Sequence, residues 1–328
     1  MNTPVPSPVT VSAIVPLYNG STTIDRALQS FIDQDGPSAE CIVVDDGSRD
    51  DSLARARAWA DRFPGRITVL THPGNVNRGV AATRNLAIRH SRGTYIAFLD
   101  ADDAWHPEKL RRQIGYMEEH PACGLTYTEA RIHRDEETAG FIAGTEVLGH
   151  APPKGRGLCV TQILTISLNY IFSTVVVRRD LLDITGLFDE DLLYQSEDRI
   201  LVAKVAAVTD IARIPGVLCD YHAHASNYSA GAMRDGLVPA IFLELRTRVA
   251  VWLKDRRDLR PWTRGIVYRL IPDTAVAALL SARAPREKNN LQRNVKAILR
   301  AYPTALPFLV YGLIKHSRIG AWLRLNRH

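Results

Sequence analysis

The chain has 328 residues, of which 46% are apolar and 23% charged, values typical of a soluble globular protein. Its length allows one large α/β domain with an appendage, or two domains. The net charge of +6 conceals an asymmetry, because residues 1–230 hold 22 Lys and Arg against 29 Asp and Glu, whereas residues 231–328 hold 19 against 6. The C-terminal part is therefore basic. A solvated helical surface is the common explanation, and contact with an anionic surface, lipid head groups or nucleic acid is the alternative.

Cysteine usage and hydropathy indicate the cellular location of the protein. The four cysteines are widely spaced and form no Cys-x-x-Cys pair, which disfavours a thiolate metal site and favours buried, reduced thiols. The N-terminus is Pro-rich and polar and lacks the pattern of a signal peptide. The longest apolar run, Ala305–Ile314, is shorter than the roughly 18 residues that cross a bilayer. We expect a soluble cytoplasmic protein, with contact at the inner face of the membrane left open.

Strands and helices alternate after a loose leader at residues 1–8. The first β-rich run, Val9–Val15, breaks at Pro16 and precedes a helix over Thr23–Gln34. Further strands are expected at Cys41–Val44, Ile67–Leu70 and Tyr95–Leu99, and further helices at Ala54–Phe63, Ala81–His90 and Pro107–Glu119. This alternation predicts an α/β fold with a mostly parallel, Rossmann-like central sheet flanked by helices. Ligands of such sheets bind outside the carboxyl ends of the strands.

One of these strands ends in clustered charge. Tyr95–Leu99 runs directly into Asp100, Asp102 and Asp103. Neighbouring carboxylates repel one another and are costly to desolvate, so a buried strand does not normally end this way. A hard cation surrounded by phosphate oxygens would relieve the repulsion, as Mg²⁺ and Mn²⁺ do in proteins. An acidic turn that caps the next helix is the plainer alternative.

Polar residues follow the ends of two other strands, Pro16–Tyr18 after the first and Asp45–Asp46 after the second. All three clusters are expected at one edge of the sheet. The sequence has no Gly-x-Gly-x-x-Gly after its first strand and no Gly-x-x-x-x-Gly-Lys-Ser/Thr, which disfavours a dinucleotide fold and a P-loop. Phosphate groups would then be bound through a metal ion held by the aspartates.

The second half is predicted in less detail. Thr126–Thr128 is expected to be a strand, Arg131–Thr138 a charged turn or hairpin tip, and Ile171–Val177 a strand. A helix over Arg199–Ala207 follows Ser196, a candidate cap. Residues 231–328 are expected to form a basic helical extension.

Four ordered motifs carry a family resemblance. They are Val11–Asn19, Ile42–Ser48, Asn77–Asn85 and Tyr95–Asp103. With them the chain resembles the family-2 glycosyltransferases of the GT-A fold over residues 9–230. The resemblance implies a nucleoside-diphosphate sugar donor, Mn²⁺ or Mg²⁺, and inversion at the anomeric carbon.

The resemblance also implies roles for particular residues. Pro16, Tyr18 and Asn19 would line the base pocket, Asp46 would accept a hydrogen bond from the base, and Asp45 would lie nearby. The remaining residues on the donor side are Asn77, Arg84 with its neighbour Asn85, Asp100 and Ala101.

The resemblance assigns the metal ligands and the general base in the same way. Asp102 would be the principal metal ligand, and His224, in the run Tyr221–His224, would contact the metal or the leaving diphosphate. The family has a Glu-Asp pair at the start of a helix, matched here by Glu197 and Asp198. Asp198 would be the general base and Glu197 a supporting residue. Capping by these acids is the alternative.

These expectations describe a metal-dependent inverting glycosyltransferase with a glycan or lipid-linked acceptor, acting in bacterial surface polysaccharide or glycoconjugate synthesis. Two alternatives remain, a transferase that loads sugar onto polyprenyl phosphate and a non-catalytic scaffold that binds nucleotide sugars. A homodimer, or a basic C-terminus lying on the membrane, is compatible with the sequence. Nucleic-acid binding is disfavoured because no recognition motif is found.

Overall fold

The computed structural model describes residues 9–134, 147–152, 157, 159–165, 167–223, 231–232, 235–254, 256, 270–272, 274–275, 278, 285–306 and 309. The chain divides into two compact units. Unit 1 comprises Met1–Arg156, Leu168–Glu190 and Val208–His224, and unit 2 comprises Gly157–Ser167, Asp191–Ala207 and Ala225–His328. The helix that carries Glu197 and Asp198 thus groups with the C-terminal region expected to begin at residue 231.

Unit 1 contains one mixed sheet with the strand order β3-β2-β1-β4-β8-β6-β9-β5, and β7 pairs with β6. Its strands are β1 (Val11–Leu17), β2 (Ala39–Asp45), β3 (Ile67–Thr71), β4 (Tyr95–Phe98), β5 (Ala104–Trp105), β6 (Cys123–Arg134), β7 (Val147–Leu148), β8 (Val176–Arg178) and β9 (Asp210–Ala223). The first four strands are parallel, as predicted. Strand order reverses at β1, which lies between β2 and β4, so the ends of these three strands form the expected binding edge.

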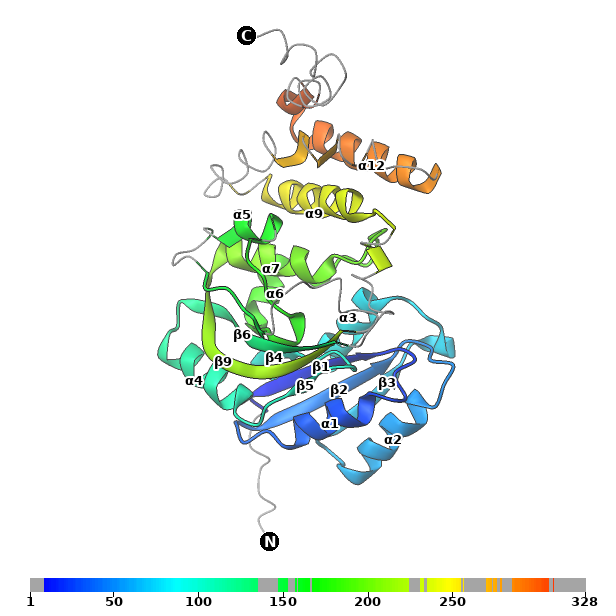
Figure 1. Ribbon diagram of the computed structural model, residues 1–328, viewed down its shortest axis with the longest axis vertical. Helices are drawn as coiled ribbons and strands as arrows, with labels where there is room; N and C mark the ends of the chain where they lie inside the picture. Colours follow the sequence, from blue (N-terminus) through cyan, green and yellow to red (C-terminus); the bar gives the residue numbers. More distant parts are fainter. Residues whose placement is uncertain are drawn as a thin grey trace. The chain divides into compact units, whose positions relative to one another are not determined.

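The helices of the parallel half are α1 (Ile24–Ile32), α2 (Ser52–Arg62) and α3 (Val80–His90). In Figure 1, α1 and α2 lie on one face of the sheet and α3 on the other. Right-handed crossovers explain this, because the chain moves outward from β1 to β3 and then returns across the sheet to β4. Buried Ile24, Leu28 and Phe31 follow the helical period and seal α1 against the strands.

One boundary of the parallel half differs from the prediction. β1 continues through Pro16 to Leu17 instead of ending before the proline. β4 pairs with β1 only as far as Ile14, so Pro16 lies where the strand has one neighbour and its missing N–H is tolerated.

The other half of the sheet is largely antiparallel. β8 pairs with β4 and with β6 in that sense, and β5 pairs with β9 likewise, while β6 and β9 are parallel. Arg131–Arg134 belongs to β6, so the prediction of a turn there was wrong for these four residues; residues 135–138 lie outside the described part of the chain. Within the predicted strand Ile171–Val177, Phe172–Thr174 forms the 3₁₀ helix η2 and only Val176–Arg178 is strand.

A lysine is buried beneath this half. Lys109 opens α4 (Lys109–Glu119), is fully buried, and its Nζ lies 4.3 Å from the ring centroid of Trp105. Among the described residues Nζ has no hydrogen-bond acceptor. Burial lowers the pKa of Lys109 to about 7 because the interior disfavours the ammonium form, with a small opposing effect from Cys219.

Lys109→Met should therefore stabilise the protein. Between pH 7 and the ordinary pKa of lysine, Lys109 is protonated in the unfolded chain and neutral in the folded one. Burial of Lys109 therefore lowers the free energy of unfolding most below pH 7, and progressively less as the pH rises. Urea unfolding should show a gain of roughly 1–3 kcal/mol at pH 6.5 and a smaller gain at pH 9. Lys288→Met, at an exposed position, is the control. Destabilisation by Lys109→Met at both pH values would show that the ammonium is needed.

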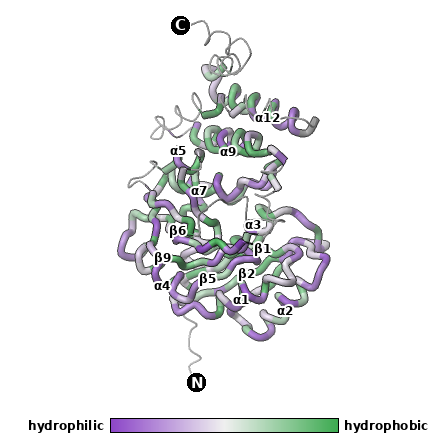
Figure 2. Tube along the Cα trace, in the orientation of Figure 1, coloured by the Kyte–Doolittle hydropathy of each residue, from purple (hydrophilic) through white to green (hydrophobic). Residues whose placement is uncertain are grey.

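Unit 2 is helical in its described part. It contains α5 (Cys159–Leu164), α7 (Glu197–Val208, all but its last residue), α9 (Val238–Leu253) and α12 (Pro285–Ala301). Fully buried Glu244 of α9 accepts hydrogen bonds from the amides of Leu193 and Tyr194 and from Arg293 of α12. Hydrophilic and hydrophobic residues alternate along α12 in Figure 2. The predicted helical character of the C-terminal region is confirmed for these segments.

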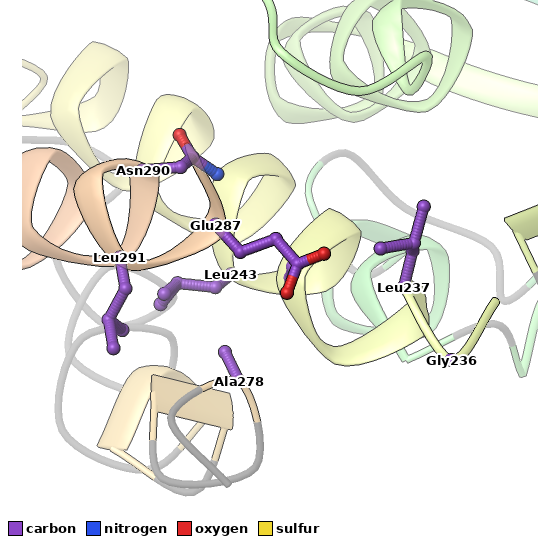
Figure 3. A pocket seen from close by; sticks show the side chains of 8 residues that line it. Gly236, Leu237, Leu243, Ala278, Glu287, Asn290 and Leu291 are labelled. Atoms are coloured by element: carbon purple, nitrogen blue, oxygen red, sulfur yellow. The ribbon is translucent and has the colours of Figure 1, made fainter. Parts of the chain in front are cut away.

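A small pocket lies between α9 and α12. Figure 3 shows Leu243 of α9 and Leu291 of α12 on its wall, with Ala278 opposite and the carboxylate of Glu287 at its side. The lining includes few polar groups and none of the predicted donor or metal residues. In the described part of the chain, no helix is both long and apolar enough to span a membrane.

Candidate functional site

The carboxylate of Asp46 is committed to the backbone. Its Oδ1 accepts the amide of Arg78 at 2.6 Å, and its Oδ2 accepts the amide of Gly79 at 2.9 Å. His72 Nε2 lies 3.6 Å from Oδ1, and the side chain is almost completely buried. Asp46 therefore joins the end of β2 to the loop that enters α3, and its oxygens are already used.

Asp45 has the available oxygen. Its Oδ2 accepts the amides of Gly47 and Ser48, both at 3.1 Å. No donor among the described residues reaches Oδ1, although the side chain is fully buried. A buried carboxylate oxygen without a donor is costly, which sets Asp45 Oδ1 apart from the other oxygens of this turn.

Two exposed apolar side chains flank the Asp45–Ser48 turn. Tyr18 follows Leu17, which pairs with Asp45, and is 49% exposed. Val76 is 52% exposed, and its backbone lies against Gly47, where φ is +75° and an added Cβ would fall 3.0 Å from the Val76 carbonyl carbon. An aromatic ring and a branched aliphatic group beside an unsatisfied acceptor suit a planar heterocycle.

Asn19 has a structural role at this edge. Its amide donates to Ser48 Oγ at 3.0 Å, and its Oδ1 accepts the amide of Arg49 at 2.8 Å. Its φ of +50° lies in the left-handed region that Asn tolerates. Asn19 thus ties the loop after β1 to the loop after β2.

Arg84 holds the end of β4. Its Nη2 donates to Asp100 Oδ1 at 2.7 Å, and its guanidinium lies 4.7 Å from the ring centroid of Phe172 and 5.6 Å from that of Phe188. The residue is 4% exposed. Arg84, predicted on the donor side, thus contacts an aspartate that follows β4.

Asn85 contacts the segment around Phe188. Its Nδ2 donates to the Phe188 carbonyl at 2.9 Å and to Glu190 Oε1 at 2.7 Å, and its Oδ1 accepts the Phe188 amide at 2.9 Å. This bidentate contact fixes the segment that carries one of the two rings against Arg84. Its role is to position that segment.

Asp103 is the buried member of the acidic turn, which is formed by Asp100, Asp102 and Asp103. It accepts hydrogen bonds from Ser173 Oγ at 2.5 Å and from the His222 amide at 3.1 Å, and Ser173 Oγ also accepts the Asp100 amide. Burial, with the charges of Asp102 and Asp100, raises the pKa of Asp103 well above its ordinary value. The three carboxylates are thus close enough to repel one another. Ser173 was not singled out from the sequence. Its hydroxyl within an apolar run is the one feature of the sequence that could have indicated a buried hydrogen bond.

The imidazole of His222 lies at the same turn. Burial lowers the pKa of His222, and Arg26 and His133 act in the same direction while Asp220 and Asp102 oppose them. Arg26 Nη2 donates to the Asp102 carbonyl at 2.5 Å. The metal candidate His224 lies outside the described residues.

Other predicted residues are placed as follows. Pro16 is in β1, Asn77 is exposed on the loop before α3, and Ala101 is half-buried beside Asp100. Glu197 and Asp198 open α7 in unit 2, where Glu197 is buried and Asp198 Oδ1 accepts the amide of Arg199 at 2.7 Å. Ser196 Oγ is buried with no partner among the described residues, so it does not act as the predicted cap.

A match to a family model decides the classification. Residues 12–183 match the model described as glycosyl transferase family 2, which is more than half of the chain. The chain belongs to glycosyl transferase family 2. The matched residues contain all four motifs on which the resemblance rested, except for Val11 at the start of the first.

Similar proteins include bacterial glycosyltransferases. The chain is 30% identical over 171 residues to the Escherichia coli UDP-Glc:α-D-GlcNAc-diphosphoundecaprenol β-1,3-glucosyltransferase WfgD, covering 52% of this chain and 66% of that protein. It is 29% identical to WfaP of the same activity and species, covering 69% and 82%. A putative teichuronic acid glycosyltransferase of Bacillus subtilis, TuaG, is 36% identical over 36% of this chain and 45% of its own length. The chain thus spans less than two thirds of the length of WfgD and TuaG and 82% of that of WfaP.

Solved structures share the fold. TarS 1–349 of S. aureus in complex with UDP-GlcNAc superposes with a TM-score of 0.70 at 19% identity, covering 98% of this chain and 93% of that one. A mannosyltransferase of Pyrobaculum calidifontis with GDP-Man and Mn²⁺ gives 0.55 at 18% identity, covering 94% and 88%. The predicted GT-A architecture, a curled α/β sheet flanked by helices, is confirmed by these likenesses.

Proposed function

We propose that this chain is a metal-dependent inverting glycosyltransferase that moves a sugar from a nucleoside-diphosphate sugar to an acceptor hydroxyl. The observation that carries the proposal is the acidic turn at the end of β4, where Asp100, Asp102 and Asp103 meet beside the ends of β1 and β2. Family membership and the names of the relatives support the reaction class.

The acidic turn fits a divalent metal whose remaining ligands come from the phosphates of the donor. In the described part of the chain, no group of three His, Cys, Asp or Glu side chains forms a closed metal site. Mg²⁺ and Mn²⁺ need only one or two carboxylates when phosphate oxygens supply the other ligands. Burial is the main cause of the raised pKa of Asp103, and the charges of Asp102 and Asp100 add to it; a cation at the turn would relieve this second effect. Asp102 would hold the metal with help from His224, and the bound ion would stabilise charge on the departing diphosphate.

The chain's own residues would perform the remaining tasks. Tyr18 would cover one face of the nucleobase. Asp45 would accept a ring N–H in place of Asp46, because Asp45 Oδ1 has no donor among the described residues whereas each oxygen of Asp46 already accepts one backbone amide. Arg84 would hold Asp100 in place. Asp198 would take the proton of the acceptor hydroxyl with Glu197 in support, and single displacement from the face opposite the diphosphate inverts the anomeric carbon.

The acceptor we propose is a lipid-linked glycan of bacterial surface polysaccharide synthesis. Two relatives are named for transfer to a sugar on diphosphoundecaprenol. The basic C-terminal region would favour contact with the inner face of an anionic membrane. On α12, Lys288, Lys296 and Arg300 are exposed on one side of the helix.

The test is a panel of nucleotide sugars with Mn²⁺, Mg²⁺ or chelator, measuring binding by calorimetry and release of nucleoside diphosphate. Uracil, thymine and guanine carry a ring N–H that can donate to Asp45, whereas adenine and cytosine do not, so UDP-, dTDP- or GDP-sugars should bind in preference. Binding without turnover on any acceptor would favour a non-catalytic scaffold. Absence of binding in the presence of metal would overturn the proposal.

Asp45→Asn should weaken donor binding about 10- to 100-fold. The amide oxygen can still accept the Gly47 and Ser48 amides, but an NH₂ then stands where the base needs an acceptor. Calorimetric titration with the preferred nucleoside diphosphate measures the effect. Asp51→Asn, an exposed change just before α2, is the control. If Asp46→Asn alone weakens binding while the fold is intact, the assignment made from sequence holds instead.

A further inference from the structure

A carboxylate between two imidazoles lies close to the acidic turn. Asp220 of β9 is bound on Oδ2 by His106 Nε2 at 2.9 Å and on Oδ1 by His133 Nε2 at 2.8 Å. Burial alone would raise the pKa of Asp220, but the hydrogen bonds from His133 and His106 outweigh it and hold the pKa below its ordinary value. Asp220 therefore links three segments, the residue after β5, strand β6 and strand β9.

The link continues to the acidic turn. Two residues beyond Asp220, the ring of His222 stacks on that of His133, with centroids 4.7 Å apart and planes 12° apart. The His222 amide donates to Asp103 Oδ1 at 3.1 Å. A continuous series of contacts thus runs from Asp220 through His133 and His222 to the carboxylate next to Asp102.

Backbone pairing alone holds β5 weakly. β5 follows the acidic turn directly and has two residues, which pair with Cys219 and Asp220. The β6–β9 ladder shifts register around Glu129 and is regular again from the pair Ala130–Cys219 to the pair Arg134–Ala223, so β6 holds the end of β9 and β5 is the weakly held strand. Such a short strand needs side-chain contacts to keep its place.

We propose that Asp220 is a positioning residue of the donor site, which with His106 and His133 holds β5 against the end of β9 so that the acidic turn keeps its metal-binding geometry. The inference rests on the proposed function. Asp220 touches no reacting atom in this scheme. Its effect reaches the diphosphate side of the donor through Asp103 and leaves the base side, at Tyr18 and Asp45, unaffected.

The experiment compares two ligands of one base. Asp220→Asn should weaken binding of the preferred nucleoside diphosphate with Mn²⁺ about tenfold, the effect of losing charge-assisted hydrogen bonds. Binding of the matching nucleoside monophosphate without metal, which relies on the base side, should not change. His106→Asn and His133→Asn each remove one bond and should have smaller effects of the same kind. Asp210→Asn, the same change at the other end of β9, should alter neither affinity.

The outcomes separate the two proposals. If the wild-type chain binds no nucleoside diphosphate, the proposed function fails and the inference fails with it. If the wild type binds and Asp220→Asn binds diphosphate and metal equally well, only the inference is overturned. An equal loss of monophosphate and diphosphate binding by Asp220→Asn would also overturn it, because general damage to the fold would then explain the effect. Thermal unfolding of all variants provides the independent check on folding.

Discussion

Asp102→Asn should lower kcat for sugar transfer about 100- to 1,000-fold. The amide keeps an oxygen near the metal but loses the negative charge that attracts it. The backbone carbonyl of Asp102 still accepts its hydrogen bond from Arg26, so the turn should keep its shape. When initial rates are measured against Mn²⁺ concentration, a high concentration should restore the rate of the variant only in part.

Asp61→Asn is the matched control, since Asp61 is an exposed residue of α2 outside the site. It should leave both kcat and the Mn²⁺ dependence unchanged. A transferase that works equally well with Asn at position 102, or one that ignores chelator, would remove the metal from the mechanism.

Asp198→Asn should lower kcat about 100- to 10,000-fold while donor affinity stays at the wild-type value. Asn cannot take the proton of an attacking hydroxyl, yet its side-chain oxygen can still accept the Arg199 amide at the start of α7. Donor binding by calorimetry and transfer under single-turnover conditions separate the two effects. Asp235→Asn, an exposed change in the same unit, provides the control.

The same variant distinguishes two reaction classes. An acceptor hydroxyl needs a base, whereas a polyprenyl phosphate is already anionic. Wild-type rates for Asp198→Asn would therefore favour the polyprenyl-phosphate transferase over the proposed reaction. Parallel loss of donor affinity and rate would instead make Asp198 a donor-binding or structural residue.

Much of unit 1 could be predicted because each of its elements has a local cause. Apolar runs of strand length ending in polar residues gave β1, β2, β3 and β4, and helical spacing in Ile24–Phe31 gave α1. Parallel order and handedness then placed the strand ends together. The candidate donor residues of unit 1 follow from this order.

Hydrogen-bond assignments within the site could not be predicted in the same way. Asp45 and Asp46 are adjacent and identical in type, and only the three-dimensional path of residues 75–79 decides which one accepts the amides of Arg78 and Gly79. Asn85 and Phe188 are far apart in sequence, so nothing local reveals that contact. The extension of β6 through Arg134 was missed because its exposed charged residues resemble a turn, although β9 supplies the pairing partner.

The enclosure of Arg84 by Phe172 and Phe188 has a consequence for how a donor would be received. The guanidinium lies against two rings and donates to Asp100, so it is already oriented in the structure without a phosphate. Its charge is a permanent part of the electrostatic field at the end of β4, present before any ligand arrives. An enzyme built in this way needs little reorganisation of its own dipoles during the reaction, and reorganisation is the main cost that water imposes on charge transfer in solution.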